Sequence, residues 1–197
     1  MTDKILVLCP FGLDGGLLSK AVDLSGEASV RVLVPETDAE AARALGAAII
    51  HTLITEKPVG DEALFSRWLA EKITQWGSKI ILAPATVAMR NIMPMLAWHL
   101  NGGLTADCTG LEVDGDELIQ IRPAFGNSLM ATIRATSPVQ MATVRPGTFP
   151  PQKHPVSSAT VIPETYCPGE ERVRITETTA FGEGKPLSQA EIVVRNG

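Results

Sequence analysis

Residues 5–10 are ILVLCP, an apolar run closed by a proline, and two later stretches repeat this pattern. They are VRVLVP at residues 30–35 and IILAP at residues 80–84. Strands that are apolar on both faces are typical of a parallel sheet with helices on both sides, because a strand with one solvated face would alternate. These stretches therefore predict buried parallel strands in an α/β fold.

Helical patterns lie between these strands. Asp38 is expected to cap a helix at residues 39–45, before a short strand. The clearest helix begins after Asp61, where apolar residues recur at three- and four-residue spacing. The pattern over residues 86–100 predicts another helix, in which Pro94 should cause a kink or mark the true start. Successive strand-helix units imply right-handed crossovers within one parallel sheet.

After residue 103 the pattern changes to strands only. Residues 107–113 and 118–124 flank Asp114-Gly115, a strong hairpin signal, and residues 129–135 and 139–145 predict two further strands. We expect these strands to form a β-meander and, together with the preceding ones, a mixed sheet.

The C-terminal part is rich in prolines, which exclude a continuous helix after residue 148. Residues 1–149 are therefore expected to form an α/β scaffold domain, and residues 150–189 an extended segment and linker. Alternation at residues 173–176 predicts an edge strand within that segment. Residues 190–197 are expected to be the first strand of a further, truncated domain.

Composition excludes several classes of function. The net charge is −5 without a basic cluster, which argues against a nucleic acid or an anionic membrane as partner. No apolar run approaches the roughly 20 residues of a membrane-spanning helix, and no signal-peptide pattern is visible, so we expect a cytoplasmic protein without membrane insertion. Neither the cysteines nor the histidines have metal-site spacing. These residues are Cys9, Cys108, Cys167, His51, His99 and His154.

A glycine-containing turn follows the first strand. Gly12, Gly15 and Gly16 precede a predicted helix, where many α/β folds hold a phosphate group. Their spacing matches neither the dinucleotide fingerprint nor the P-loop, so a tight turn without a ligand is the alternative.

Two Arg-Pro steps lie near glycines. They are Arg122-Pro123, followed by Phe125-Gly126-Asn127, and Arg145-Pro146-Gly147. Glycine permits the positive φ of a sharp turn, and arginine at a strand end can bind a partner. One interpretation is that these residues only shape turns and leave the arginines solvated; the other is an interface between domains or subunits.

Three motifs carry a resemblance to a known family: TADCTGLE at residues 105–112, RPAFGNSLMATI at 122–133 and QMATVRPG at 140–147. In this order and spacing, the chain resembles the N-terminal domain of the alpha subunit of electron-transfer flavoproteins over about residues 79–149. One departure is Asn127-Ser128, where the family pattern has Gly-Asn.

The resemblance implies a redox role. Such an alpha subunit pairs with a beta subunit, and FAD, bound mainly in the alpha C-terminal domain, carries electrons from a dehydrogenase to a quinone reductase or another acceptor. This chain would then be the scaffold, without a cofactor or catalytic residue of its own. The residues expected to serve as interface or structural positions are Arg122, Phe125, Gly126, Asn127, Arg145, Pro146 and Gly147.

The expected fold class is α/β, a three-layer sandwich with a mostly parallel, Rossmann-like sheet plus a C-terminal β-meander. Two other functions remain open. One is a stand-alone adenine-nucleotide-binding domain that uses residues 12–16, and the other is an assembly domain that associates through sheet edges or exposed apolar surface.

Overall fold

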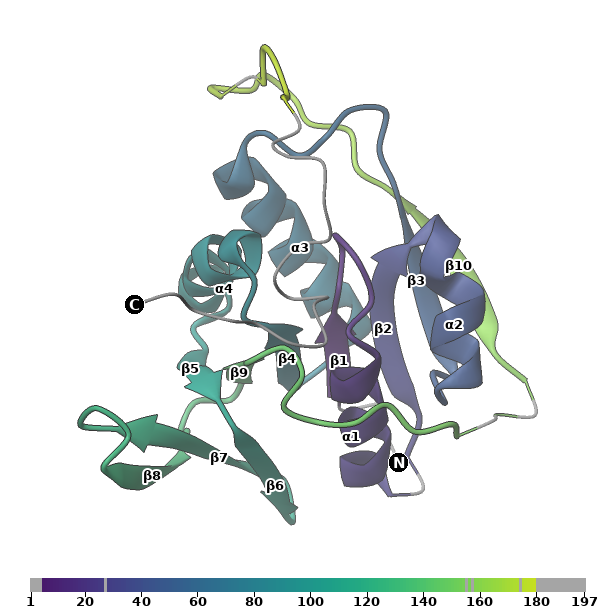
Figure 1. The fold of residues 1–197 in the computed structure, drawn as a ribbon. Coiled ribbons are helices and arrows are strands. Elements are labelled where there is room, and N and C mark those ends of the chain that lie inside the picture. The colour runs from purple at the N-terminus through teal and green to yellow at the C-terminus, as the bar shows by residue number, and fades with distance from the viewer. Residues whose placement is uncertain (1–4, 27, 155, 157, 174, 180–197) are drawn as a thin grey trace, which may run out of the picture.

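The computed structural model describes residues 5–26, 28–154, 156, 158–173 and 175–179. A seven-stranded sheet lies at its centre, in the order β10-β3-β2-β1-β4-β9-β5, and every neighbouring pair is parallel (Figure 1). The strands are β1 (Ile5–Leu8), β2 (Val30–Pro35), β3 (Ile49–Ile54), β4 (Ile80–Pro84), β5 (Gly103–Cys108), β9 (Gln140–Val144) and β10 (Thr160–Thr165). The three apolar runs are β1, β2 and β4, so the predicted parallel sheet is confirmed.

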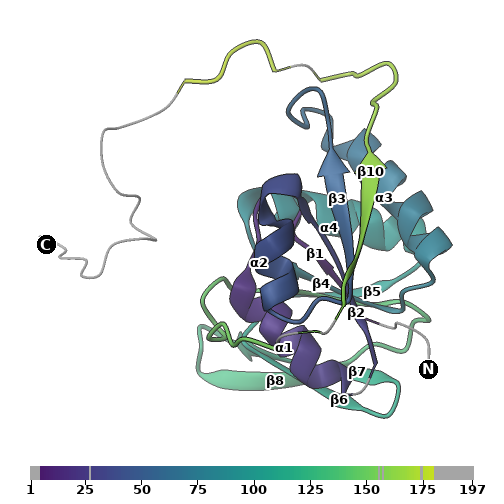
Figure 2. The same cartoon turned by 90° about the vertical axis from the view of Figure 1, so that its right-hand side faces the viewer.

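Helices cover both faces of this sheet (Figure 2). Helices α1 (Gly15–Ser25) and α2 (Ala39–Ala44) pack on one face, and α3 (Glu62–Trp76) and α4 (Val87–Leu100) on the other. A single tight helical turn, η1 (Glu36–Asp38), precedes α2. Along β1, alternate residues enter the two separate cores, because successive side chains of a strand point to opposite faces. The three-layer sandwich is confirmed.

The two longer helices begin at side-chain caps. Asp61 Oδ1 accepts hydrogen bonds from the backbone N–H groups of Ala63 and Leu64 at the start of α3. Thr86 Oγ1 accepts one from the N–H of Met89 at the start of α4. Pro94 lies inside α4 and is therefore not its start.

A second sheet contains the meander. It consists of the antiparallel strands β6 (Gly110–Asp114), β7 (Glu117–Ala124) and β8 (Leu129–Arg134), in that order. The expected strand at residues 107–113 is divided between β5 and β6, and the expected strand at 139–145 is β9, which leaves the meander for the parallel sheet. The prediction of one mixed sheet was therefore wrong. All five residues of β9 are buried, as a strand covered on both faces requires.

Two buried glutamines join the small sheet to the large one. Gln140 Oε1, from β9, accepts a hydrogen bond from the N–H of Leu118 at 2.6 Å. Gln120, from β7, donates through Nε2 to the carbonyl oxygen of Met141 at 3.2 Å, and Thr105 donates to its Oε1. The small sheet is thus oriented by directional bonds from buried amides, which cost free energy if left unpaired.

Replacing Gln140 with alanine is expected to destabilise the chain by about 2–3 kcal/mol, because the buried N–H of Leu118 loses its acceptor and a cavity remains. Urea denaturation measures this loss. Gln75→Ala, at an exposed position of α3, is the control and should change stability by less than about 0.5 kcal/mol. Equal losses in the two variants would contradict the proposed role of Gln140.

The C-terminal segment adds the edge strand β10. The described residues after 148 contain no helix, as expected, and the edge strand lies at residues 160–165. Of the residues at which an edge strand was expected, 173, 175 and 176 lie in no strand, and residue 174 is outside the described residues. Pro163 is tolerated in β10 because an edge strand needs hydrogen bonds on one side only. The predicted strand at 190–197 and the end of the predicted linker lie outside the described residues.

Candidate interaction surface

The loop between β7 and β8 has an unusual backbone. Phe125, Gly126 and Asn127 have φ values of 47°, 64° and 69°. The N–H of Ser128 donates a hydrogen bond to the carbonyl oxygen of Phe125 at 3.2 Å and so closes the turn. A positive φ is uncommon for a bulky residue and costs free energy, so such conformations concentrate at functional positions. In this loop the conformation leaves the Phe125 side chain 83% exposed.

The strand that follows this loop is also apolar and exposed. Leu129 and Met130 are 60% and 58% exposed. Strand β8 pairs only with β7 among the described strands, so its outer edge is free. In Figure 1 the small sheet projects from the body of the molecule. A free strand edge beside exposed apolar side chains is typical of a surface that binds another protein chain.

Arg122 and Arg145 both lie near Cys108. The N–H of Arg145 donates to the carbonyl oxygen of Cys108 at 3.1 Å. Burial raises the pKa of the Cys108 thiol to about 11, and the nearby charge of Arg122 opposes this rise. Burial likewise raises the pKa of Cys9 to about 12. Both thiols are therefore protonated at neutral pH and act as structural residues.

The remaining predicted positions form the turn after β9. Pro146 and Gly147 are exposed, Gly147 has a φ of 75°, and the N–H of Thr148 donates to the carbonyl oxygen of Arg145 at 3.2 Å. Arg122 lies in β7, two residue pairs before the hairpin loop in the β7–β8 ladder. Of the predicted residues, Phe125, Gly126 and Asn127 thus form the hairpin loop, Arg145, Pro146 and Gly147 lie in the turn after β9, and Arg122 lies in β7.

Two carboxylates bind backbone N–H groups near the N-terminus of α1. Asp14 Oδ1 accepts from the N–H of Leu17 at 2.9 Å, and Asp38 Oδ2 accepts from the N–H of Leu13 at 2.8 Å. Asp38 thus binds this loop instead of capping α2. A Cβ added at Gly16 would lie 1.9 Å from the carbonyl oxygen of Phe149. Asp14 and Asp38 thus occupy two backbone N–H groups of this loop, and their negative charges would repel a phosphate, which argues against an adenine nucleotide here.

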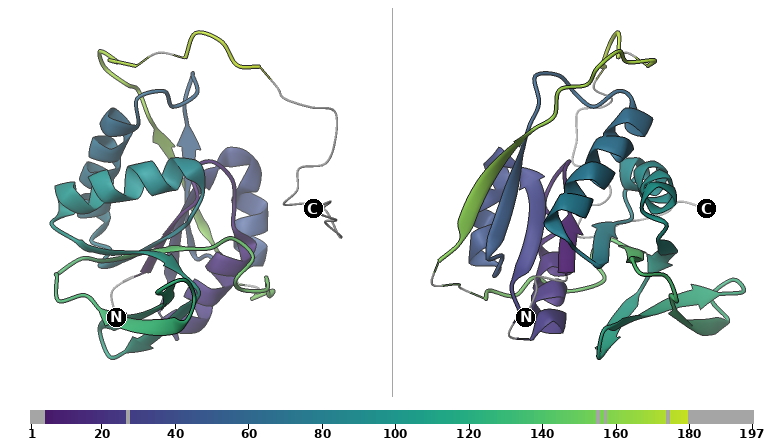
Figure 3. Two further views of the ribbon diagram at one scale, coloured as in Figure 1. Left: turned by 60° about the vertical axis from the view of Figure 1, so that its left-hand side comes forward. Right: turned by 180° about the vertical axis from the view of Figure 1, so that it is seen from behind.

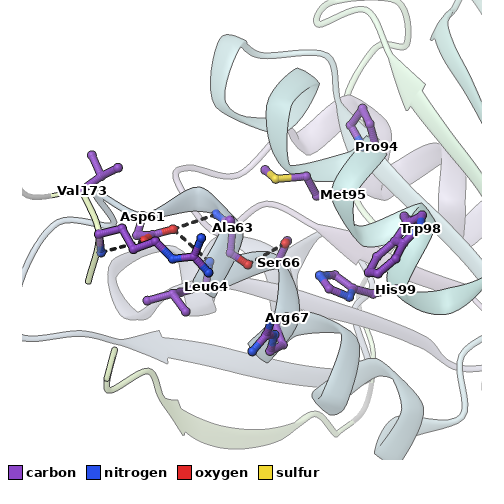
Figure 4. Close-up of a pocket in the computed structure, with 11 residues that line it drawn as sticks. Asp61, Ala63, Leu64, Ser66, Arg67, Pro94, Met95, Trp98, His99 and Val173 are labelled. Atoms are coloured by element: carbon purple, nitrogen blue, oxygen red, sulfur yellow. Dashed lines mark hydrogen bonds between the residues drawn. The ribbon is translucent and has the colours of Figure 1, made fainter. Parts of the chain in front are cut away.

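A groove between α3 and α4 was not predicted as a site. Its volume is about 640 Å³, and Trp98, which is 80% exposed, forms one wall with Pro94 and Met95 (Figure 4). Leu64 and Val173 lie on the opposite side. The sequence signal was that Trp98 falls outside the buried stripe of its helix.

The described residues contain no group of three or more histidine, cysteine or carboxylate side chains that could hold a metal ion. None of the helices in this part of the chain is long and apolar enough to cross a membrane.

The fold is thus an α/β domain whose parallel sheet is joined to a projecting antiparallel sheet. The chain belongs to the electron transfer flavoprotein domain family, whose model matches residues 13–166. The family resemblance of its motifs is thereby confirmed.

Its relatives include electron transfer flavoprotein alpha subunits. The alpha subunit from Thermoanaerobacterium thermosaccharolyticum is 45% identical over 85 residues, which are 42% of this chain and 26% of that protein. The protein FixB from Bradyrhizobium diazoefficiens is 34% identical over 141 residues, or 68% of this chain and 38% of that protein. Subunit LctC of a lactate dehydrogenase (NAD(+),ferredoxin) from Acetobacterium woodii is 36% identical over 123 residues, or 59% and 29%. The chain therefore matches well under half the length of each of these relatives.

Proposed function

We propose that this chain is the scaffold domain of an electron transfer flavoprotein alpha subunit and that it binds a beta subunit through the β7–β8 hairpin and the turn after β9. The observation that carries the proposal is the 83% exposure of Phe125 on a loop with three consecutive positive φ values. An exposed aromatic anchor on a rigid turn loses little conformational entropy when it is buried by a partner.

The other predicted residues have definite places in this surface. Gly126 and Asn127 hold the loop in its left-handed conformation, and Gly147 does the same for the second turn. Arg122 and Arg145 would supply positive charge to this surface, and a carboxylate of the beta subunit would pair with them. Pro146 restricts the backbone of the second turn.

The proposal places FAD outside this chain, in a further domain of the alpha subunit. The carboxylates of Asp14 and Asp38 at the N-terminus of α1 support this placement, because their negative charges would repel a phosphate at the usual position. The whole flavoprotein would work in the cytoplasm and carry electrons from a dehydrogenase to a quinone reductase or another acceptor. This chain would contribute no catalytic residue.

The test is to mix the purified chain with the beta subunit of the same organism and to measure binding by calorimetry and flavin content by absorbance. We expect the two proteins to form a one-to-one complex. We also expect this chain, purified alone, to contain no stoichiometric FAD. Stoichiometric FAD in the isolated chain would contradict the placement of the cofactor, and absence of a complex would contradict the scaffold role.

Self-association is the second candidate, favoured by the free edge of β8. Two copies could pair their β8 strands around a twofold axis. Light scattering over a range of concentrations separates the two candidates, since a chain that binds only the beta subunit stays monomeric.

A further inference from the structure

Helices α3 and α4 form the outer layer on their face of the large sheet (Figure 3). The C-terminal segment forms one end of the groove between them, because the backbone N–H of Arg172 donates to Asp61 Oδ2 at 3.1 Å. A second hollow of about 440 Å³ shares Arg67 and His99 with this groove and reaches Gln75. Together the two hollows follow α3 for about 20 Å, at about 1.5 Å per residue. A depression of this length accommodates a segment of polypeptide.

The surface of α4 beside this depression is apolar. Val87, Pro94 and Trp98 recur at seven- and four-residue spacing, which places them on one face of the helix. Val87 is 83% exposed and Trp98 is 80% exposed, and the ring of His99 contacts that of Trp98 edge-on with 5.0 Å between centroids. Met95 adds an unbranched side chain that adapts to the shape of its contacts. Exposed apolar side chains in one stripe are typical of a surface that another chain covers.

One positive charge in the groove has no partner within the described residues. Arg67 of α3 is exposed, and its side chain forms no ion pair or hydrogen bond with the part of the chain that the structure describes. Asp61 and Arg172 also line the groove, and their charges offset each other. The backbone hydrogen bond from Leu64 lowers the pKa of Asp61 most, and the charge of Arg172 lowers it further. Glu71 lines the second hollow but not the first, so the first hollow favours a negative group near Arg67.

We propose that the groove between α3 and α4 binds an acidic amphipathic helix of a partner protein, with its apolar stripe on Pro94 and Trp98 and a carboxylate on Arg67. Two packed helices with a hollow between them offer the ridges and grooves into which a third helix packs. A basic helix is disfavoured, because its cations would face the guanidinium group of Arg67. This surface belongs to other elements than the hairpin proposed for the beta subunit, so neither surface depends on the other.

The test is a selection with the purified full chain from a library of displayed helical peptides. The peptides share an apolar stripe at positions i, i+3, i+4 and i+7, and the positions beside the stripe are randomised among Glu, Gln and Lys. We expect the selected peptides to carry Glu at these positions at least about tenfold more often than Lys. Absence of enrichment, or equal use of Glu and Lys, would overturn the proposal.

The binding position is measured by NMR with a selected peptide and the isotope-labelled chain. We expect the largest shifts in the backbone signals at residues 61–67 and 94–99, which line the groove from its two helices. Shifts confined to other parts of the chain would show that the peptide binds elsewhere and would contradict the proposed site.

Two variants separate this site from a non-specific apolar surface. Trp98→Ser should weaken binding of a selected peptide about 30-fold, because the exposed aromatic anchor is lost. Arg67→Glu should reverse the preference in a repeated selection from Glu to Lys. Arg43→Glu is the control, because Arg43 is also exposed but lies in α2 on the opposite face of the sheet, and it should leave the preference unchanged. A preference for Glu that survives Arg67→Glu would overturn the proposal, even if Trp98→Ser fails to fold.

Discussion

Replacing Gly16 with alanine is expected to destabilise the chain by about 3 kcal/mol, the largest loss from a single added methyl group. The new Cβ would lie 1.9 Å from the carbonyl oxygen of Phe149, a backbone atom that cannot move without its segment. That segment is also held by Ser19, whose hydroxyl accepts from the N–H of Gln152 at 2.9 Å. The connection between β9 and β10 must therefore shift away from α1.

Gly15→Ala is the matched control for this prediction, because it is the neighbouring residue of the same helix. Its added Cβ would lie 3.1 Å from the Cδ1 of Leu45, the end of a flexible side chain. We expect a change below about 1 kcal/mol, since alanine also favours the helix. Urea denaturation of both variants provides the comparison, and a Gly16→Ala protein as stable as Gly15→Ala would show that residues 149–152 do not pack as described.

Replacing Phe125 with serine is expected to weaken binding of the beta subunit about 100-fold without changing the stability of the chain by more than about 0.5 kcal/mol. The side chain is 83% exposed, so the folded chain loses few contacts, whereas the proposed complex loses its aromatic anchor. Calorimetric titration with the beta subunit, together with urea denaturation of the chain alone, measures both effects.

Trp98→Ser is the control for Phe125→Ser, because Trp98 is also aromatic and 80% exposed but lies in the groove of α4. We expect it to leave the affinity for the beta subunit unchanged. If Trp98→Ser weakens binding and Phe125→Ser does not, the beta subunit binds the groove between α3 and α4 instead of the hairpin.

The sequence predicted the elements with local signals and missed the pairing that depends on distant partners. The apolar runs at β1, β2 and β4 predicted buried strands, since burial on both faces leaves a continuous hydrophobic pattern. Strand β9 has a similar pattern, but its place between β4 and β5 is a long-range pairing that no local signal contains. Strand β10 was missed because its proline argued against a strand and only the edge position makes it acceptable.

The site could be predicted in part for the same reason. Gly126 and Gly147 predicted sharp turns with a positive φ, and both residues have a positive φ in the structure. The exposure of Phe125 and the free edge of β8 depend on the orientation of the small sheet relative to the large one. The side-chain amides of Gln120 and Gln140 fix this orientation through their hydrogen bonds. A buried glutamine carries no periodic signal in a sequence. The partner of Gln120 lies 21 residues away, and the partner of Gln140 lies 22 residues away.

The carboxylates at the start of α1 have a consequence for biosynthesis. In a fold that binds a nucleotide at this helix end, the ligand supplies the negative charge that favours the helix dipole. Here Asp14 and Asp38 supply the negative charge from within the chain. The loop therefore forms its hydrogen bonds as soon as the polypeptide folds, without a ligand. With FAD placed outside this chain, as proposed, we expect this domain to fold and to bind the beta subunit before any flavin is loaded.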